Sequence, residues 1–461
     1  MRITLPGRCR DTAPLQSAAA GFLLLALLAA VLSPPGFWLL LAAATAAAIL
    51  FLAYRHLEAV TAAWLLVAGA TLEMTLGDML GLDAYQPIIA AVKAVGLGLA
   101  LLAVLRYGPR LDPWNPAYAW LAMFAAGLAH GLYPALSTGD SVRSLIGSAA
   151  PFAFCFSRLS RRWARAIIRM TAWIPLLTVT AGALLDAGGV RPLFINSGGL
   201  RLAGLGHPAF LAGFCLTAIY AGLIELFRDG RPSRLWLLAA NAVLLLLTGA
   251  RAPLFYAAAV SLLSLLFVPS AALSPRLRVL LLLGGATALP VLAALAGDLA
   301  DIRAINLLLT APADLSGRQE LWPSFEQAAA LSPWWGWGVG AGNAIIPPES
   351  PLVQSLHTWA AHNEYLRVAV EGGQCGRALL VACFVLWVRG HTARLVPSDR
   401  AIMRLVFTAF AFHALTDNVL ISTSACVLFA FATAVFARGQ HEQSRAERDA
   451  PAARAVQQNA A

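Results

Sequence analysis

The sequence predicts an all-α protein that crosses a membrane with about 12 to 14 helices and carries one large loop outside the membrane. The first observation is composition: 59% of the 461 residues are hydrophobic and 12% are charged, whereas roughly a quarter are charged in an ordinary soluble domain. The second is the recurrence of apolar runs, and the third is one long polar stretch, residues 298–362, that interrupts them. We expect each apolar run to be a helix, because a helix satisfies its backbone polar groups within the segment.

The apolar runs approach the roughly 20 residues that a helix needs to cross the hydrocarbon core. Before the polar stretch they cover residues 18–32, 36–53, 60–76, 87–105, 117–133, 145–156, 164–185, 208–227, 235–248, 253–268 and 277–296. After it they cover residues 363–388 and 403–436, and the last run is long enough for two half-length spans. The expected organisation is therefore a transmembrane region 1–297, an external loop 298–362 with an amphipathic helix, a transmembrane region 363–437, and a cytoplasmic tail 438–461 that we expect to be disordered.

The arginines indicate the orientation of the chain in the membrane. Most of them gather in alternate loops: Arg2, Arg8, Arg10, Arg55, Arg106, Arg110, Arg158, Arg161, Arg162, Arg165, Arg228, Arg231, Arg234, Arg276, Arg278, Arg389, Arg394, Arg400, Arg404 and the tail 438–454. The positive-inside rule places these loops and both termini in the cytoplasm, and the loop 298–362 outside. The first apolar run lacks a clean cleavage site, so we expect it to be a retained span. The net charge of +10 follows from this topology and predicts no nucleic-acid partner.

Cysteines and acidic residues predict neither a disulfide nor a metal site. Four of the cysteines fall inside expected spans: Cys155, Cys215, Cys383 and Cys426. The chain has no CxxC pair. In the external loop, Asp298 and Asp301 have no evident third ligand. We therefore expect no metal and no cofactor.

Three arginines break the topology rule, and each stands beside glycine on the external side. They are Arg201 in SGGLR, Arg251 in TGAR and Arg318 in SGR. A guanidinium group fits phosphate oxygens in a bidentate way, and adjacent glycines let the backbone approach an anion. For any one arginine alone, contact with lipid headgroups or with loop carbonyls is an equally good explanation. We interpret Arg191 and Arg303, which are also external, in that second way.

His362 is the candidate general base, because a histidine takes a proton from a hydroxyl near neutral pH. It stands where the external loop meets the next helix, and Asn363 and Glu364 are expected to orient it. Glu371 lies seven residues after Glu364, on the same helix face, before a Gly-Gly pair interrupts the helix. A single histidine at an interface is more often structural than catalytic, and His357 is an alternative candidate nearby.

The external loop also contains an amphipathic run and a glycine-rich segment. The run covers residues 318–330, and its residues Gln319 and Glu320 are candidate supporting groups. The sequence WWGWGVGAG follows at residues 334–342. Tryptophans at this boundary usually anchor the protein in the interface; the alternative is that they stack on sugars above a tight glycine loop. The glycine pattern alone is weak evidence for phosphate binding, because no strand precedes it.

Along the chain, the three glycine-flanked arginines, the glycine-rich segment and the motif that starts at His362 follow each other in a fixed order. This order resembles that of the O-antigen ligase and polymerase superfamily of bacterial cell-envelope glycosyltransferases. The resemblance covers most of the chain, and HNEYLRVAVEGG at residues 362–373 is its most specific part. The length of the chain and the lack of an added soluble domain are most similar to lipopolysaccharide O-antigen ligases. The motifs do not separate ligases from polymerases, which extend a lipid-linked glycan.

The resemblance implies a GT-C-like fold in the bacterial inner membrane and a reaction on the periplasmic face. The donor would be an O-antigen on undecaprenyl pyrophosphate, and the acceptor a sugar of the lipid A core. Arg201, Arg251 and Arg318 match positions that hold the pyrophosphate, and His362 matches the base. No metal or nucleotide takes part.

Physical chemistry agrees with that implication. A site outside the cytoplasm has no nucleotide sugar, so the donor must arrive attached to a lipid, and fixed guanidinium groups can neutralise a diphosphate leaving group. A single displacement would invert the anomeric carbon, although Glu320 and Glu364 stay open as nucleophiles.

Ionisable residues inside the other apolar runs suggest a competing function. They are Glu73, Lys93, His413, Asp417 and Asn418. Residues of this kind mark proton or substrate pathways, so a lipid-linked or proton-coupled transporter is the alternative. A transporter would give no reason for the polar motifs to gather in one external loop.

Overall fold

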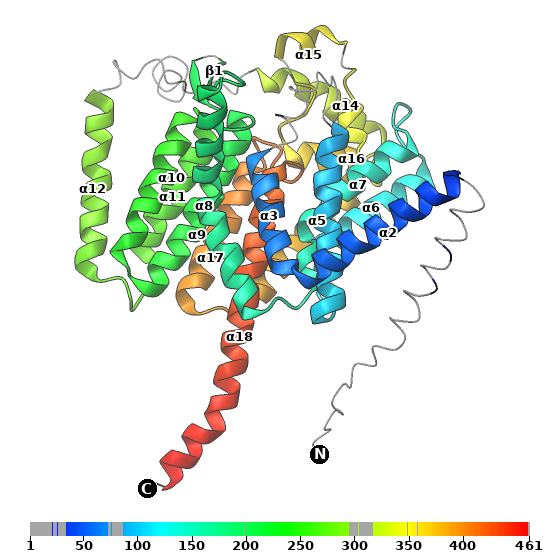
Figure 1. Ribbon diagram of the computed structural model, residues 1–461. Coiled ribbons are helices and arrows are strands. Elements are labelled where there is room, and N and C mark those ends of the chain that lie inside the picture. Colours follow the sequence, from blue (N-terminus) through cyan, green and yellow to red (C-terminus); the bar gives the residue numbers. More distant parts are fainter. Residues whose placement is uncertain are drawn as a thin grey trace. The chain divides into compact units, whose positions relative to one another are not determined.

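The computed structural model describes residues 21, 25, 34–71, 75, 86–197, 199–294, 303, 317–347, 349–356 and 358–459. Two compact units divide the chain, Met1–Leu57 and Glu58–Ala461. In the first unit the structure describes helix α2 (Pro34–Arg55). The second unit holds the candidate site, and its described residues are predominantly helical (Figure 1).

The described elements after α2 are mostly helices. The α-helices are α3 (Leu57–Ala70), α5 (Gln86–Tyr107), α6 (Ala117–His130), α7 (Thr138–Ala149), α8 (Arg161–Ala187), α9 (Pro208–Asp229), α10 (Leu235–Leu247), α11 (Arg251–Phe267), α12 (Pro275–Ala294), α14 (Trp322–Leu331), α15 (Pro351–Leu356), α16 (Glu364–Thr392), α17 (Pro397–His413) and α18 (Thr423–Asn459). The 3-10 helices are η1 (Ala150–Phe156), η2 (Pro232–Arg234), η3 (Arg318–Leu321) and η4 (Ala341–Asn343). Strands β1 (Phe194–Asn196) and β2 (Leu200–Leu202) form an antiparallel hairpin in which Ile195 pairs with Arg201.

Within the described ranges, four helices are long and apolar enough to cross a membrane. They are Ile88–Tyr107 of α5, together with α8, α9 and α16; the consecutive helices Leu41–Arg55 and Leu57–Ala70 add a fifth if they count as one span. The helical class and the capacity to span a membrane are thus confirmed. The number of membrane crossings, 12 to 14, stays a prediction.

Helix α9 lies at the centre of the bundle in the second unit. It contacts α8, α10, α11, α17 and α18, and Figure 1 shows α8, α10 and α11 grouped around it. Of the four candidate spans it is the most enclosed, with 83% of its most apolar window buried. A helix that is apolar on all sides is expected at such a place, because every face meets another helix.

One expectation about a segment needs correction. The run 145–156 is not one span: α7 ends at Ala149 and Pro151 lies in the 3-10 helix that follows, since proline cannot donate the hydrogen bond that continues an α-helix. The run 403–436, which we considered long enough for two half-length spans, does belong to two helices, α17 and α18, separated by residues 414–422. Helix α18 continues to Asn459, and the disordered tail 438–461 stays a prediction.

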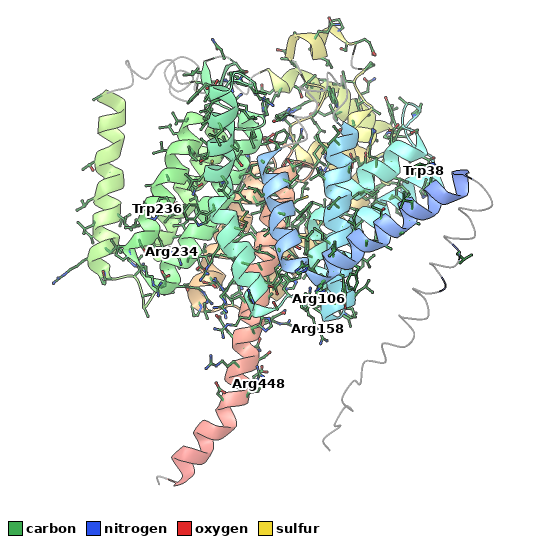
Figure 2. All side chains as sticks on the ribbon, in the orientation of Figure 1. Trp38, Arg106, Arg158, Arg234, Trp236 and Arg448 are labelled. Carbon is green, nitrogen blue, oxygen red and sulfur yellow. The ribbon has the colours of Figure 1, made fainter. Side chains whose placement is uncertain are left out.

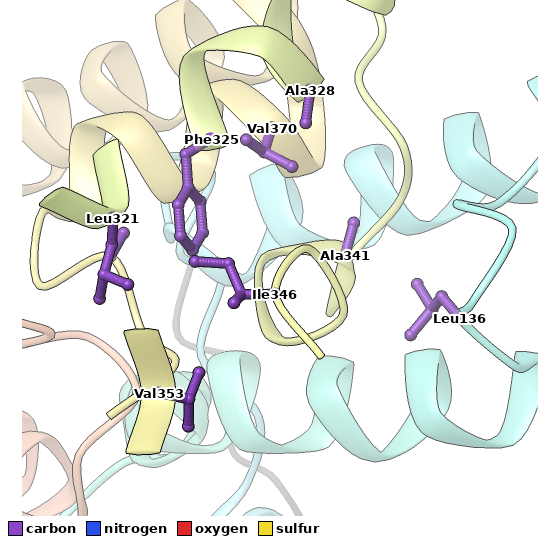
Figure 3. Close-up of a cluster of buried hydrophobic side chains, with 9 residues drawn as sticks. Leu136, Leu321, Phe325, Ala328, Ala341, Ile346, Val353 and Val370 are labelled. Atoms are coloured by element: carbon purple, nitrogen blue, oxygen red, sulfur yellow. The ribbon is translucent and has the colours of Figure 1, made fainter. Parts of the chain in front are cut away.

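A layer of short elements covers α16 at the upper end of Figure 1, where α14 and α15 lie. Its hydrophobic core joins Leu321 and Phe325 to Val370 of α16, and Figure 3 shows Phe325 beside Val370. Buried apolar contact of this kind fixes a loop layer on a helix, because each large side chain removed from water contributes about 1.5–3 kcal/mol. The loop that carries the candidate base therefore rests on an ordered surface.

At the opposite end, arginines that the sequence assigns to the cytoplasm gather. Figure 2 shows Arg106, Arg158 and Arg234 toward the lower end of the second unit. There Arg228 pairs with Asp399 at 2.9 Å and with Glu442 at 2.6 Å. These arginines and the layer of α14 and α15 thus lie at opposite ends of the second unit (Figures 1 and 2), and the orientation in the membrane stays a prediction.

Candidate active site

His362 occupies a strained backbone position two residues before α16. Its φ is +47°, a left-handed value that is uncommon for residues other than glycine. Asn363 directly after it is the N-cap of α16, and the Asn363 side chain accepts a hydrogen bond from the backbone N–H of Leu366 at 3.1 Å. Strain of this kind persists only where the surroundings fix the residue, and it is concentrated at functional sites.

Both nitrogens of the His362 ring have partners. Nδ1 lies 3.0 Å from Oδ1 of Asp417, and Nε2 lies 3.0 Å from the hydroxyl of Thr358. A carboxylate can only accept, so Nδ1 carries the proton and donates it to Asp417, while Nε2 accepts from Thr358. In this tautomer the single lone pair of Nε2 accepts from Thr358, and an acceptor hydroxyl that takes the place of Thr358 could give its proton to Nε2.

The carboxylate of Asp417 lies at the meeting point of several positive or polar groups. Nη1 of Arg318 lies 3.8 Å from Oδ1, and Nε2 of His413 lies 3.7 Å from Oδ2. Burial alone would raise the pKa of Asp417, but the contacts with His362 and His413 outweigh burial and hold this pKa well below its ordinary value. The carboxylate is thus ionised at neutral pH.

Asp417 lies in the connection 414–422, and Glu364 binds this connection to α16. Oε1 of Glu364 accepts from the backbone N–H of Leu420 at 2.7 Å, and the backbone N–H of Glu364 donates to the carbonyl of Ala414 at 2.8 Å. The Nζ of Lys93 donates to the carbonyl of Ile421. Our expectation for Asn363 and Glu364 needs correction, because Asp417 and Thr358 orient His362. A catalytic role for Asn363 or Glu364 stays a prediction.

A buried charge network runs along α16. Arg367 donates to Glu364 at 2.6 Å and to Glu371 at 2.9 Å, and all three side chains are buried. The expectation that Glu364 and Glu371 share a helix face is confirmed, and Gly373 breaks the helix with φ +59° and ψ −161°. Arg367 is the residue that the sequence reading missed, although its spacing of three from Glu364 and four from Glu371 is a recognisable ion-pair pattern.

A cluster of arginines adjoins the His362–Asp417 pair. Arg201 on β2 is buried, and its Nε donates to the carbonyl of Thr248 at 2.9 Å. A Cβ added to Gly249 would lie 3.0 Å from Arg303 and 3.3 Å from Arg201, so both side chains pass this glycine closely. Burial, followed by the charges of Arg303 and Arg318, lowers the pKa of Arg201 to about 10. We name Arg201, Arg303 and Arg318 the arginine cluster.

Arg318 connects the cluster to the candidate base. Its Nη1 donates to the carbonyl of Thr416 at 3.3 Å, next to Asp417, while its charge acts on Arg201. The structure therefore brings Arg318 and His362 to the same carboxylate, and Arg201 lies within range of the Arg318 charge. Guanidinium groups that lie near one another form a site suited to a polyanion.

The outcome for Arg191 and Arg303, which we interpreted as headgroup or loop contacts, is mixed. Arg191 does bind loop carbonyls, those of Leu205 at 3.2 Å and Gly206 at 3.0 Å. Arg303 lies against Gly199 and Gly249, beside Arg201. The interpretation of Arg303 as a headgroup or loop contact stays a prediction, and this arginine also belongs to the arginine cluster.

For the other site residues predicted from the sequence, the structure gives a position but no contact that indicates a role. Arg251 is the first residue of α11 and is half-buried, three positions after the Thr248 carbonyl that binds Arg201. Gln319 and Glu320 are exposed on η3. His357 lies outside the described residues. The roles of these four residues stay predictions.

The glycine-rich segment packs against the break in α16. Gly336, Gly338 and Gly340 all have positive φ, and a Cβ at Gly336 would lie 2.5 Å from the carbonyl carbon of Glu371. The backbone N–H of Gly338 donates to the Glu371 carbonyl at 2.9 Å. These glycines are thus needed for close packing on α16. Trp335, about half exposed, stacks on His130 with ring centroids 5.2 Å apart.

An apolar cavity of about 810 Å³ lies between α16 and α17. Glu364, Ala414 and Leu420, which also position the Asp417 connection, line one part of it. Arg389 and Arg404 line another part, and most of the other lining residues are hydrophobic. Such a cavity fits a hydrocarbon chain better than a sugar. Among the described residues there is no group of three or more His, Cys, Asp or Glu side chains that could hold a metal.

Comparison with known proteins agrees with the resemblance in the sequence. Residues 235–381 match the model of a family described as O-antigen ligase. The match includes Arg251, Arg318 and the motif that starts at His362, and it confirms the superfamily for this segment. No curated protein matches the chain. Arg201 and Asp417 lie outside the matched segment, so their place in the site comes from the structure.

Proposed function

We propose, from its similarity to the O-antigen ligase superfamily, that this protein is an inner-membrane glycosyltransferase. It transfers a preassembled glycan from undecaprenyl pyrophosphate to the lipid A core on the periplasmic face. The observation that carries the proposal is the contact of the His362–Asp417 pair with Arg318, whose charge also acts on Arg201. A base and a polyanion site adjoin each other there, as transfer from a diphosphate donor requires.

The reaction is a single displacement at the anomeric carbon of the donor sugar. The acceptor hydroxyl oxygen forms the new bond from the side opposite the pyrophosphate, and its proton passes to Nε2 of His362. The bond from the anomeric carbon to the pyrophosphate oxygen breaks, and its electron pair leaves with undecaprenyl pyrophosphate. Asp417 accepts the Nδ1 hydrogen bond and stabilises the imidazolium ion. The configuration at the anomeric carbon inverts.

Arg201, Arg251, Arg303 and Arg318 bind the pyrophosphate and neutralise the charge that grows on it as the bond breaks. Fixed guanidinium groups act strongly here because they are partly withdrawn from water and already in place. Arg201 is held by Thr248 and Arg318 by Thr416, at 2.9 Å and 3.3 Å. Such backbone contacts prevent the side chains from reorganising during the reaction.

The apolar cavity between α16 and α17 supports a lipid-borne substrate. It shares Glu364 and Leu420 with the segment that positions Asp417. A hydrocarbon chain in this cavity would keep its head group near the base. The periplasmic orientation is supported by the arginine-rich end that lies opposite α14 and α15 (Figures 1 and 2).

The test supplies purified protein in nanodiscs with an undecaprenyl-pyrophosphate glycan as donor. The acceptor is either lipid A core or a second molecule of the donor. We expect glycan on the lipid A core. Glycan transferred to a second donor molecule would instead identify a polymerase, and movement across vesicles with neither product would identify a transporter.

The matched variant is His362→Ala, which we expect to abolish transfer while the melting temperature stays within a few degrees of the wild type. Near-normal turnover of this variant would remove His362 as the base.

A further inference from the structure

The apolar cavity between α16 and α17 has two ends of different chemistry. Glu364, the first residue of α16, lines one end, and Arg389, in the last turn of the same helix, lines the other. Arg404 of α17 lines the cavity together with Arg389. Among the described residues that line the cavity, Glu364 is the one carboxylate. We name the part of the cavity at Arg389 and Arg404 the basic end, and nearly the whole length of α16 separates it from Glu364.

The two arginines of the basic end have no carboxylate partner among the described residues. Nε of Arg404 donates to the hydroxyl of Thr392 at 3.2 Å, which fixes this side chain beside the end of α16. Both Arg389 and Arg404 are exposed. By contrast, Arg228 close by pairs with Asp399, in the first turn of α17, at 2.9 Å. Two exposed guanidinium groups that line the same end of a cavity favour an anion as ligand.

The wall of the cavity that leads away from the basic end is apolar. On α16 it consists of Leu380, Val381, Phe384, Val385 and Val388. From Leu380 to Arg389 this wall is roughly 14 Å long at about 1.5 Å per residue, close to half of a hydrocarbon core of about 30 Å. Val385 is 60% exposed, so the wall is accessible from outside the protein. Its length therefore fits the acyl chains of one bilayer leaflet.

We propose that the basic end of this cavity binds an anionic phospholipid. The lipid phosphate contacts Arg389 and Arg404, because guanidinium groups fit phosphate oxygens in a bidentate way, and the acyl chains lie along the apolar wall of α16. Basic pockets between transmembrane helices on the cytoplasmic side suit such head groups, and the positive-inside rule assigns Arg389 and Arg404 to that side. The site goes beyond the proposed function, which places the head group of the donor near Glu364, at the other end of α16.

The bound lipid stabilises the pair of helices that carries the candidate base. It contacts α16 and α17 together, and a ligand that binds the folded state alone raises the stability of that state. Added anionic phospholipid should therefore raise the melting temperature of the protein.

The test measures binding of phosphatidylglycerol and of zwitterionic phosphatidylethanolamine to the full chain by native mass spectrometry. The double variant Arg389→Gln with Arg404→Gln removes both charges, and Val385→Trp keeps the charges but fills the apolar wall. Arg158→Gln is the matched control, since Arg158 is exposed at the lower end of the second unit (Figure 2) and does not line the cavity. The melting temperature without added lipid shows whether each variant folds.

We expect the wild type to prefer phosphatidylglycerol and the double variant to bind it about 10- to 30-fold more weakly, as for loss of two arginine contacts with an anionic lipid. Val385→Trp should also bind it more weakly, and this variant decides if the double variant does not fold. Arg158→Gln should bind like the wild type. Wild-type affinity in the double variant or in Val385→Trp, or equal affinity of the wild type for both lipids, would overturn the proposal. No donor or acceptor takes part, so the result is independent of the proposed function.

Discussion

Oδ1 of Asp417 lies 3.0 Å from Nδ1 of His362, although 55 residues separate the two in sequence. The contact joins the start of α16 to the connection between α17 and α18. It gives the candidate base a fixed tautomer and a partner for the charge that it gains. Arg318, 3.8 Å from the same oxygen, links this pair to the arginine cluster.

Replacing Asp417 with asparagine tests this pair. Asp417→Asn keeps the size of the side chain but removes the charge that stabilises the imidazolium ion of His362. We expect kcat to fall about 100- to 10,000-fold, the usual range for general base catalysis, with little change in the donor KM. Steady-state transfer to lipid A core measures both. A wild-type kcat would show that His362 needs no carboxylate.

The guanidinium shape of Arg251 is tested by Arg251→Lys, which preserves charge but loses the bidentate contact with phosphate. We expect the donor KM to rise about tenfold, equivalent to about 1.4 kcal/mol. The control is Arg143→Lys, since Arg143 pairs with Asp140 on an exposed part of α7. Donor kinetics that are unchanged in Arg251→Lys would count against a phosphate contact.

Glu364 is expected to matter for stability as well as for activity. Glu364→Gln removes the carboxylate that pairs with buried Arg367 and accepts from Leu420. Removing one partner of a buried ion pair costs about 3–5 kcal/mol, and the hydrogen bond from Leu420 that holds the connection with Asp417 weakens because its acceptor is no longer charged. The melting temperature in detergent and the transfer rate should fall together. Loss of transfer with no change in melting would indicate that Glu364 acts in the chemistry itself.

Alanine substitutions at two glycines distinguish the cost of backbone strain from the cost of a steric clash. Gly336→Ala forces a Cβ to 2.5 Å from Glu371 at φ +70°, whereas Gly131→Ala at φ +108° meets nothing within 4 Å. Both variants carry the cost of about 1–2 kcal/mol for a left-handed backbone, and only Gly336→Ala adds the clash with α16. We expect a clearly larger loss of melting temperature for Gly336→Ala. Equal losses would mean that the loop does not pack as described.

The stability of the protein should depend on pH through His207, the N-cap of α9. Its folded pKa is about 4, below the value of about 6.5 in the unfolded chain. Below about pH 6.5 the unfolded state therefore binds a proton that the folded state does not, and stability falls as the pH is lowered toward 4. The loss of melting temperature between pH 7.5 and 5.5 should be smaller in His207→Asn. An equal loss in both proteins would show that His207 is not the group responsible.

Features that depend only on neighbouring residues in the chain could be identified from the sequence. The apolar runs predicted the helical membrane class, because composition and length alone decide whether a segment is compatible with a bilayer. The position of His362 before Asn363 and the break at the Gly-Gly pair were likewise readable, since caps and helix breaks depend on adjacent residues. Arg201 and Arg318 were identified because they lie in loops that the positive-inside rule assigns to the outside, where arginine is less common.

Tertiary structure alone decided which distant groups meet. The sequence marked Asp417 as an ionisable residue in an apolar run, a sign that also fits a transporter, and it gave Glu364 the orienting role that Asp417 holds. It did not place Arg303 beside Arg201 and did not select Arg367. Side chains from different helices and loops have no fixed spacing in the chain, so their partners depend on how helices pack and where the connections between them turn back. Periodicity and caps describe one element at a time, and a site built from several elements exists only once these elements are packed together.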